Sequence, residues 1–198
     1  MTKIAFIDDD GSLEAYTVLL PMLEKFGFKG SFAVVTNRIG RKGYMNKTQL
    51  LDLQQRGHEI LSHSKTHPHM TDILLSEAAF ELQSSKTDLE NMDVEVNSFV
   101  FPFNEANTNV SIQALRVYDW AFVGEKGNHL PGNLKRVGVG GKRVGVTRRW
   151  VDQADSTLFL YGHSRDWNKL IRRQIRKLFK YISEKQLTIQ TVNTILKQ

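Results

Sequence analysis

The sequence predicts an α/β fold in which helices cover a parallel sheet. Short apolar runs alternate with longer amphipathic segments along the whole chain, a pattern typical of βαβ units. Acids and histidines follow directly after several of these runs, and parallel α/β folds place their chemistry at the carboxyl ends of strands. The chain has 198 residues, which is enough for one sizeable core and short for two, so we expect a single domain over residues 1–198.

The first half of the chain predicts three strands and three helices. Residues 4–7 are apolar and lead to a turn at Gly11, which indicates a buried strand. An amphipathic helix is expected at 13–26, a strand at 31–35, a helix from the cap Asn46 to Arg56, and a strand at 59–62. Residues 76–92 form the longest expected helix, with Phe80, Leu82 and Leu89 as core positions.

The second half of the chain continues the alternation. Apolar runs at residues 98–101, 121–123 and 158–161 predict three more strands. Residues 167–185 carry an apolar stripe at helical spacing and a basic opposite face, so we expect a surface helix packed on the sheet. The glycine-rich residues 127–145 are interpreted as loops around a short segment at 135–139.

Two polar clusters carry the chemistry. Asp8-Asp9-Asp10-Gly11 follows the first expected strand, and His63-Ser64-Lys65-Thr66-His67 follows the third. Two imidazoles four residues apart can share one ion if the segment coils. Two histidines and one aspartate make a three-ligand site with an open position, the pattern of a catalytic zinc. A second aspartate beside the ligand can act as a base toward water activated by the metal.

These clusters resemble those of the polysaccharide deacetylase family, of the NodB-homology or carbohydrate esterase 4 type. Asp9-Asp10-Gly11 is similar to the first motif of that family, and His63, Ser64 and His67 are similar to the second. Phe101-Pro102-Phe103 resembles the aromatic-proline-aromatic turn of the third motif. The run from Leu158 to His163 looks like the strand that ends in the last catalytic histidine, and the resemblance spans roughly residues 3–195.

The resemblance implies a fold, a cofactor and a reaction. The fold would be a distorted, incomplete (β/α) barrel, with residues 135–139 as a late strand. Asp10, His63 and His67 would hold one divalent ion, Zn²⁺ in the first place and Co²⁺ or Ni²⁺ as options. Asp9 would be the catalytic base and His163 the acid, and the reaction would remove N-acetyl groups from an amino-sugar-containing glycan. The residues that contact the substrate or stabilise its oxyanion would be Pro102, Phe103 and Trp167. The backbone N–H of Phe103 would donate a hydrogen bond to the oxyanion.

Three positions depart from the family pattern. Asp8 stands where the family has phenylalanine, which adds a third acid beside the site. The arginine that often precedes the proline of the third motif is replaced by Val100 or Phe101. The fourth motif has no convincing match, because Asp119-Trp120 precedes an expected strand instead of following one.

Composition narrows the setting. The chain lacks cysteine, which excludes disulfides and thiolate metal ligands. No apolar stretch is long enough to span a bilayer. Met1 runs straight into the first expected strand without a leader. We therefore expect a cytoplasmic protein, or an extracellular one if a leader had been removed. Fourteen of the 27 Lys and Arg residues lie in residues 126–150 and 167–185. We interpret them as solvated faces, with attraction of an anionic glycan, a nucleic acid or a membrane surface as the alternative.

The expected partner is an N-acetylated glycan, neutral or anionic. Nucleic acid is not expected, since aromatic residues are not interleaved with the basic ones as stacking platforms. We expect a monomer. Two other functions stay open: a metal-dependent amidase that acts on a non-sugar amide, and a catalytically inactive glycan-binding homologue. Retention of Asp9 and His163 argues against the inactive homologue, because binding alone needs neither a base nor an acid.

Overall fold

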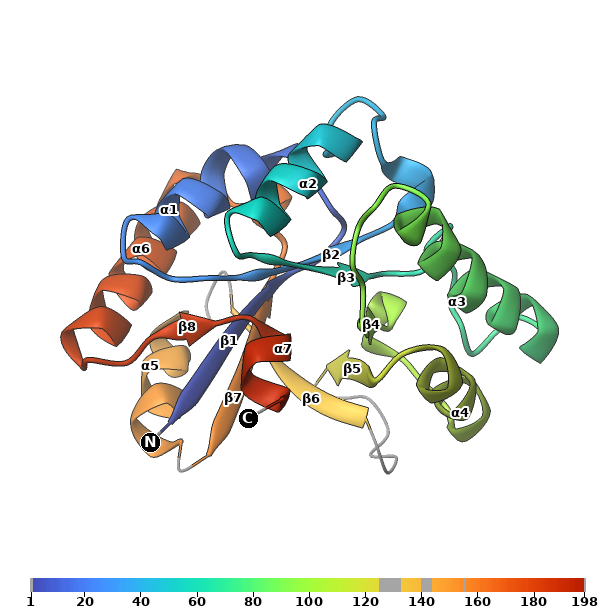
Figure 1. The fold of residues 1–198 in the computed structure, drawn as a ribbon. Helices are drawn as coiled ribbons and strands as arrows, with labels where there is room; N and C mark the ends of the chain where they lie inside the picture. Colours follow the sequence, from blue (N-terminus) through green and yellow to red (C-terminus); the bar gives the residue numbers. More distant parts are fainter. Residues whose placement is uncertain (1, 125–132, 140–143, 155, 198) are drawn as a thin grey trace.

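The computed structural model describes residues 2–124, 133–139, 144–154 and 156–197 and contains a barrel of parallel strands surrounded by helices (Figure 1). The strands are β1 (Lys3–Asp8), β2 (Ser31–Val34), β3 (Glu59–Ser62), β4 (Ser98–Val100), β5 (Trp120–Gly124), β6 (Asn133–Gly138), β7 (Thr157–Gly162) and β8 (Ile189–Gln190). The helices are α1 (Leu20–Glu24), α2 (Lys47–Gln55), α3 (Leu75–Glu90), α4 (Thr108–Val117), α5 (Val144–Gln153), α6 (Lys169–Glu184) and α7 (Val192–Leu196).

Seven of the strands, β1 to β7, form the barrel, and its closure is incomplete. Strand β1 pairs along its whole length with β7, but it pairs with β2 only at its carboxyl end, where Ile7 lies opposite Ser31 and Asp8 opposite Phe32. At the other end of β1, the short strand β8 takes the free edge through Ile4 and Ala5. The expected fold class, a distorted and incomplete (β/α) barrel, is confirmed.

Alternate residues of each strand separate the interior of the barrel from the layer under the helices. The interior cluster contains Ala5, Ile7, Ala33, Leu61, Val100, Phe122 and Phe159, and Val192 and Ile195 of α7 join it. Ile4 and Phe6, the neighbours of opposite parity, pack into the larger cluster together with the helices. A strand's side chains alternate between its two faces, so Asp9 continues the interior row of β1 and Asp8 continues the outer row.

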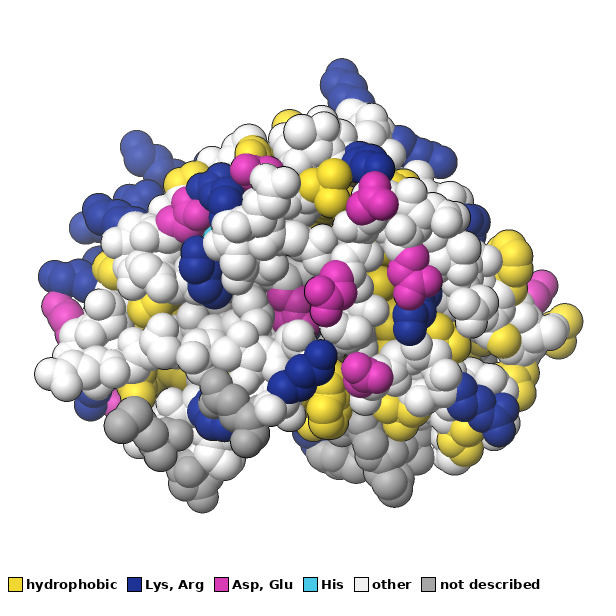
Figure 2. Space-filling model, in the orientation of Figure 1, with side chains coloured by type: hydrophobic (Ala, Val, Ile, Leu, Met, Phe, Trp, Pro, Cys, Tyr) yellow, Lys and Arg dark blue, Asp and Glu magenta, His cyan; other side chains and the backbone are white. Residues whose placement is uncertain are grey.

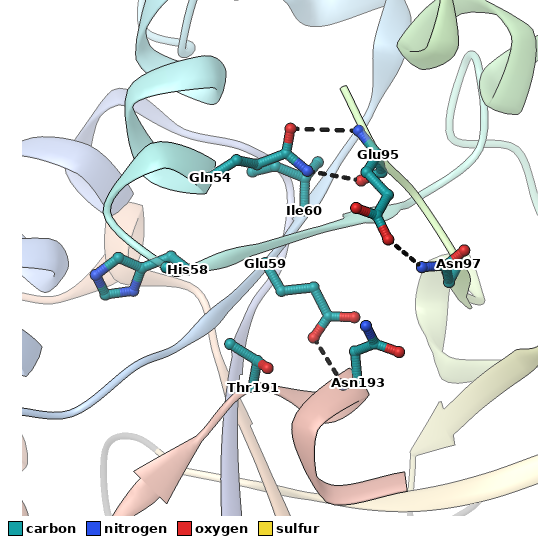
Figure 3. A pocket seen from close by; sticks show the side chains of 9 residues that line it. Gln54, His58, Glu59, Ile60, Glu95, Asn97, Thr191 and Asn193 are labelled. Carbon is teal, nitrogen blue, oxygen red and sulfur yellow. Dashed lines mark hydrogen bonds between the residues drawn. The ribbon is translucent and has the colours of Figure 1, made fainter. Parts of the chain in front are cut away.

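Helix α7 is held at the amino ends of the strands, across the barrel from the site. The Glu59 carboxylate accepts hydrogen bonds from the Asn193 N–H at 3.0 Å and from the Ser31 hydroxyl at 2.9 Å. Glu59 and Asn193 border a polar cavity of about 170 Å³ (Figure 3). Burial raises the pKa of Glu59 to about 6, against its hydrogen bonds, which lower it. The site described below lies at the carboxyl ends of the strands.

Most of the expected elements are present, with local differences that have physical reasons. The helix expected at 13–26 is a π-helical turn over Ala15–Leu19 followed by α1, because Pro21 lacks an N–H and its ring clashes with a regular preceding turn. The expected start of α2 is confirmed, since Asn46 forms a capping box with Gln49.

The core prediction for α3 is right at two positions and wrong at one. Leu82 and Leu89 are fully buried, whereas Phe80 is 61% exposed. Phe80 lies two positions from Leu82, which turns it by about 200° to the opposite face of the helix. Together with Leu74, Leu75 and Ile112 it belongs to the large hydrophobic side chains exposed on α3 and α4, where Figure 2 shows yellow groups at the right of the molecule.

Helices α4, α5 and α7 and strand β8 were not among the expected elements, and α5 begins inside the stretch interpreted as loops. The basic residues Lys126, Lys142 and Arg143 lie outside the described residues. In the part of the chain that the structure describes, every helix is too short or too polar to cross a membrane.

Candidate active site

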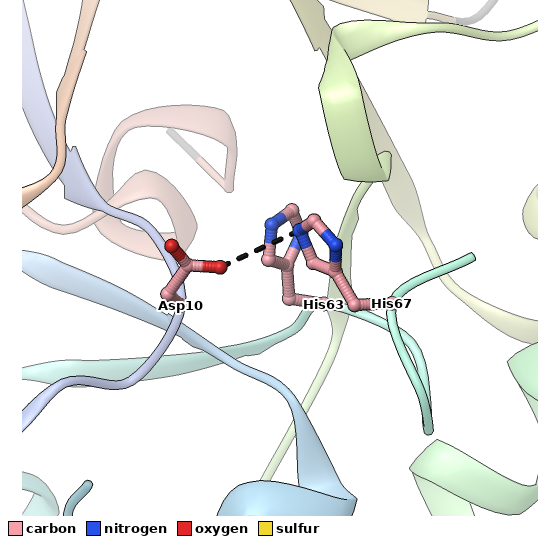
Figure 4. Close-up of side chains that lie close together, drawn as sticks. All are labelled: Asp10, His63 and His67. Atoms are coloured by element: carbon pink, nitrogen blue, oxygen red, sulfur yellow. Dashed lines mark ion pairs between the residues drawn. The ribbon is translucent and has the colours of Figure 1, made fainter. Parts of the chain in front are cut away.

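Asp10, His63 and His67 come together at the carboxyl end of the barrel (Figure 4). Asp10 follows β1, His63 follows β3 directly, and one potential ligand atom from each of the three lies within 4.8 Å of the others. The His67 Nε2 atom is 3.4 Å from Asp10 Oδ1. The structure thus joins the three predicted metal ligands, although Asp10 and His63 are more than fifty residues apart in the chain.

The two histidines meet through left-handed backbone conformations instead of a helical coil. Ser64 has φ 65° and His67 has φ 68°, and the two imidazole centroids are 4.8 Å apart. Five of the seven non-glycine residues with positive φ in the described part of the chain are Asp10, Ser64, His67, Phe103 and Asn104. Such conformations are costly and cluster at functional sites, where the surrounding structure holds them.

Glu81 of α3 holds the loop that carries His67. Its carboxylate accepts hydrogen bonds from the backbone N–H groups of Lys65 and Thr66, at 2.9 and 2.8 Å, and from the Thr66 hydroxyl at 2.7 Å. The Glu81 residue is only 7% exposed. A buried carboxylate with three donors fixes the loop, and no pattern in the sequence predicted this supporting role.

The histidines have the protonation state that metal binding requires. The Nδ1–H of His63 donates to the Val100 carbonyl at 2.7 Å, which leaves Nε2 as the ligand atom. Burial lowers the pKa of His63, and burial together with the His63 charge lowers the pKa of His67 to about 4. Both rings are therefore neutral near pH 7, and neutral imidazole is the form that binds a metal.

Asp9 forms a buried, bidentate ion pair with Arg136 of β6. The two guanidinium NH groups donate to the two carboxylate oxygens at 2.6 and 2.9 Å, and Arg136 is fully buried. Burial alone would raise the pKa of Asp9, but the charge of Arg136 is the main effect that opposes it, and the pKa is held below its ordinary value. Asp9 is thus kept as a carboxylate in a fixed orientation.

Arg136 has two further contacts beside Asp9. It donates to Asn104 Oδ1 at 2.8 Å, and its guanidinium carbon lies 4.4 Å from the centre of the Tyr161 ring. The Asn104 amide in turn donates to the Tyr161 hydroxyl at 3.2 Å. A Cβ at Gly124 would stand 2.6 Å from the Asn104 Cβ, so the glycine provides the space for this contact.

The alternation of side chains along β6 is a sequence signal that could have identified Arg136. Arg136 has the same parity as Leu134, which packs against the interior cluster, whereas Lys135 between them is exposed. An arginine on the interior row of a strand needs a charged partner. Strand alternation therefore places Arg136, not Lys135, on the interior face of β6, and the tertiary structure brings it to the acids.

Asp8 has a structural partner and does not face the metal ligands. Its carboxylate accepts from the Ser164 N–H and the Ser164 hydroxyl, both at 2.8 Å. Burial raises the pKa of Asp8 well above its ordinary value, against the effect of these two hydrogen bonds. The third acid ties the end of β1 to the segment that follows His163.

Of the remaining predicted residues, His163, Phe103 and Pro102 lie at the site, and Trp167 does not. His163 Nε2 is 4.0 Å from Asp9 Oδ2, and the His163 side chain is 37% exposed. The Phe103 ring stacks on His69, with ring centres 3.6 Å apart, and its centre is 4.7 Å from that of His67. Pro102 is buried and begins the turn that carries Phe103. Trp167 is 4% exposed and packs edge-on against Phe6 in the core, so the substrate contact that we expected for Trp167 is not available in this structure.

This chain is similar to known proteins in sequence and in fold. Residues 2–122 match the family model described as polysaccharide deacetylase. The YxkH protein of Bacillus subtilis (strain 168), whose name gives the same family, is 29% identical over 84 residues. That match covers 42% of this chain and 30% of the relative, so the chain matches less than a third of the length of that curated protein.

Solved structures show the same fold at low sequence identity. The Xyl-CE4 domain of a multidomain xylanase from the hindgut metagenome of Trinervitermes trinervoides has a TM-score of 0.74 and 18% identity, covering 98% of this chain and 89% of that one. The peptidoglycan deacetylase PdaC of Bacillus subtilis has a TM-score of 0.70 and 17% identity, with coverages of 98% and 90%. A BA3943 mutant, described as a CE4 family pseudoenzyme, has a TM-score of 0.76 and 14% identity, with coverages of 98% and 67%.

The family model covers more than half of the chain, and the barrel is the one seen in the solved deacetylases. The expectation drawn from Asp9-Asp10-Gly11 and the two histidines is thereby confirmed, and this chain is a member of the polysaccharide deacetylase family.

Proposed function

We propose that this protein hydrolyses N-acetyl groups of amino sugars in an oligo- or polysaccharide and that it depends on a divalent metal ion. The observation that carries the proposal is the Asp9–Arg136 pair, which keeps a carboxylate ionised and oriented beside Asp10, His63 and His67. A site that only bound a glycan would have no use for a buried, oriented base next to three potential metal ligands.

The three ligands suit Zn²⁺. They are two neutral imidazoles and one carboxylate, and a three-ligand set of this kind leaves a coordination position open for chemistry. The ion would supply Lewis acidity, which polarises a carbonyl and lowers the pKa of water from about 15.7 toward roughly 7. Co²⁺ and Ni²⁺ are alternatives, since imidazole and carboxylate ligands also suit them.

The side chains around the ligands would carry the proton transfers. Asp9, held as a carboxylate by Arg136, accepts a proton from the attacking water. The N–H of Phe103 stabilises the charge on the acetyl oxygen, in a turn fixed by Pro102. His163, partly exposed and 4.0 Å from Asp9, protonates the departing amine. An amine anion is a very poor leaving group, so this acid is needed.

The pseudoenzyme among the structural neighbours makes the inactive alternative concrete. In this chain the base, the acid and all three potential ligands are retained, and the missing arginine of the third motif is compensated by Arg136. These residues favour an active enzyme. The alternative of a non-sugar amidase has the same chemistry and differs only in the substrate.

The test combines metal analysis with acetate release from N-acetylated oligosaccharides. Removal of the metal by a chelator should abolish acetate release, and Zn²⁺ or Co²⁺ should restore it. His63→Ala and His67→Ala should lower both metal content and rate, whereas the rim variant His69→Ala should keep its metal. Full activity of metal-free protein would refute the metal centre, and release of acetate only from non-sugar amides would favour the amidase.

A further inference from the structure

Two arginines converge on Asp10 from opposite loops. Arg38 Nη1 lies 3.1 Å from Asp10 Oδ1, and Arg165 Nη2 lies 3.2 Å from Asp10 Oδ2. Their side chains are 27% and 42% exposed, so both guanidinium groups lie at the mouth of the site, unlike the buried Arg136. The family resemblance assigned no role to either residue.

Both arginines are held in place by their loops. The loop after Arg38 is bonded to the Asp10 turn by the Met45 N–H to the Gly11 carbonyl and by the Leu13 N–H to the Gly43 carbonyl, at 3.0 and 2.9 Å. Arg165 follows Ser164, which Asp8 holds with two hydrogen bonds. Tyr44 lies between the arginines: Arg165 donates to its hydroxyl at 3.5 Å, and the Arg38 guanidinium carbon is 5.5 Å from its ring centre.

The charges around Asp10 do not balance when a divalent ion is added. Asp9 is already neutralised by Arg136, so within the described residues Asp10 is the acid that would face the ion, Arg38 and Arg165 together. Asp166 lies 3.4 Å from Arg165 Nε, but it is 65% exposed and its charge is therefore screened by solvent. The loaded site thus has an excess of positive charge at its mouth, directly beside the ligand of the ion.

We propose that Arg38 and Arg165 bind an acidic group of the substrate, so that the enzyme prefers a glycan in which the N-acetylated sugar or its neighbour carries an oxyanion. This inference rests on the proposed function. The guanidinium fork matches carboxylate and sulfate oxygens in two-point hydrogen bonds, which gives both affinity and geometry. With the Asp10 charge engaged by a bound ion, the guanidinium groups of Arg38 and Arg165 would be available to an anion of the substrate. A neutral sugar leaves both guanidinium groups without that partner.

The test compares oligosaccharides that differ only in the acid. Chitotetraose and its 6-O-carboxymethyl and 6-O-sulfated derivatives are substrates for acetate release, and their deacetylated forms are ligands for calorimetry on the zinc-loaded protein. The wild type should bind and process an acidic form better than the neutral form by on the order of tenfold, the worth of one charge-assisted contact. The carboxymethyl and sulfate forms show which oxyanion fits.

Arg38→Gln with Arg165→Gln should remove this preference in both the dissociation constants and kcat/KM. The control Arg41→Gln takes the same charge from the same loop at an exposed position and should keep the preference. Zinc affinity, measured by competition with a chelator, should stay equal or rise in the double variant, because two cations leave the neighbourhood of the ion.

Three results would overturn the inference: no preference in the wild type, a preference that survives in the double variant, or a loss of zinc affinity in that variant. The last result would mean that the arginines only orient Asp10. If the protein binds the acidic ligands better but releases acetate from no substrate, the proposed reaction fails and the acidic-glycan site stands.

Discussion

Arg136 gives the sharpest test of the proposed mechanism. It is fully buried, and it meets both oxygens of Asp9 at 2.6 and 2.9 Å. Arg136→Met removes the charge and leaves Asp9 buried without its guanidinium partner. Breaking one side of a buried pair costs about 3–5 kcal/mol of folding stability, against a total of about 5–15 kcal/mol for a typical domain. The variant should fold with a clearly lower free energy of unfolding.

The kinetic effect of Arg136→Met should act through Asp9. Without the guanidinium, burial dominates and the pKa of Asp9 rises, so the acid limb of the kcat/KM profile should move to higher pH. A general base contributes about 10²–10⁴ in rate, and the loss in the arginine variant should not exceed the loss in Asp9→Asn. Arg136→Lys keeps a positive charge but not the two-point contact of the guanidinium group. It should reverse part of the shift of the acid limb and recover a smaller part of the rate.

Acetate release over a pH series, together with denaturant unfolding, measures both effects. In the double variant Asp9→Asn, Arg136→Met the kinetic losses should not add, and stability should exceed that of either single variant, since no buried charge is left unpaired. The neighbour Lys135→Met, on the exposed face of β6, is the control. An unchanged acid limb in Arg136→Met, or fully additive kinetic losses, would refute the reasoning.

Two further predictions concern the neighbours Asp9 and Asp10, and Glu59. Asp9→Asn should retain zinc and lower kcat by a factor of about 10²–10⁴, whereas Asp10→Asn should lose the metal itself. Metal analysis beside kinetics separates the two variants. The reverse pattern would exchange the roles of base and ligand between the two aspartates. The pKa of Glu59 is raised to about 6 from its ordinary value of 4.5. Between these two pH values the folded state binds more protons than the unfolded state, so the folding stability of the protein falls as the pH rises from 4.5 to about 6. Glu59→Gln should therefore gain about 2 kcal/mol over wild type between pH 4 and 7 in denaturant unfolding, and a pH-independent difference would contradict the buried charge.

The sequence by itself determined the local chemistry of this protein. Apolar runs followed by Asp9-Asp10-Gly11 and by His63 identified two strands and the residues at their carboxyl ends. This was possible because a buried strand and the type of a potential ligand can both be recognised from a few neighbouring residues. Gly11 illustrates this: it has φ 69°, and a Cβ there would lie 2.9 Å from Val34, so the turn after the acids requires glycine. The cap at Asn46 is local in the same sense.

Only the tertiary structure decided which distant residues complete the site. Arg136 is 127 positions from Asp9, and their contact depends on the order and register of β5, β6 and β7 around the barrel, which no local pattern encodes. Burial was likewise decided by packing: Trp167 lies in the core although it adjoins a motif, and Phe80 is exposed although it is apolar. Asp8, Asp9 and Asp10 are identical side chains in sequence, but the chain turns each one toward a different partner: Ser164 for Asp8, Arg136 for Asp9, and Arg38 and Arg165 for Asp10. Burial raises the pKa of Asp8, whereas the pKa of Asp9 is lowered, against burial, by Arg136.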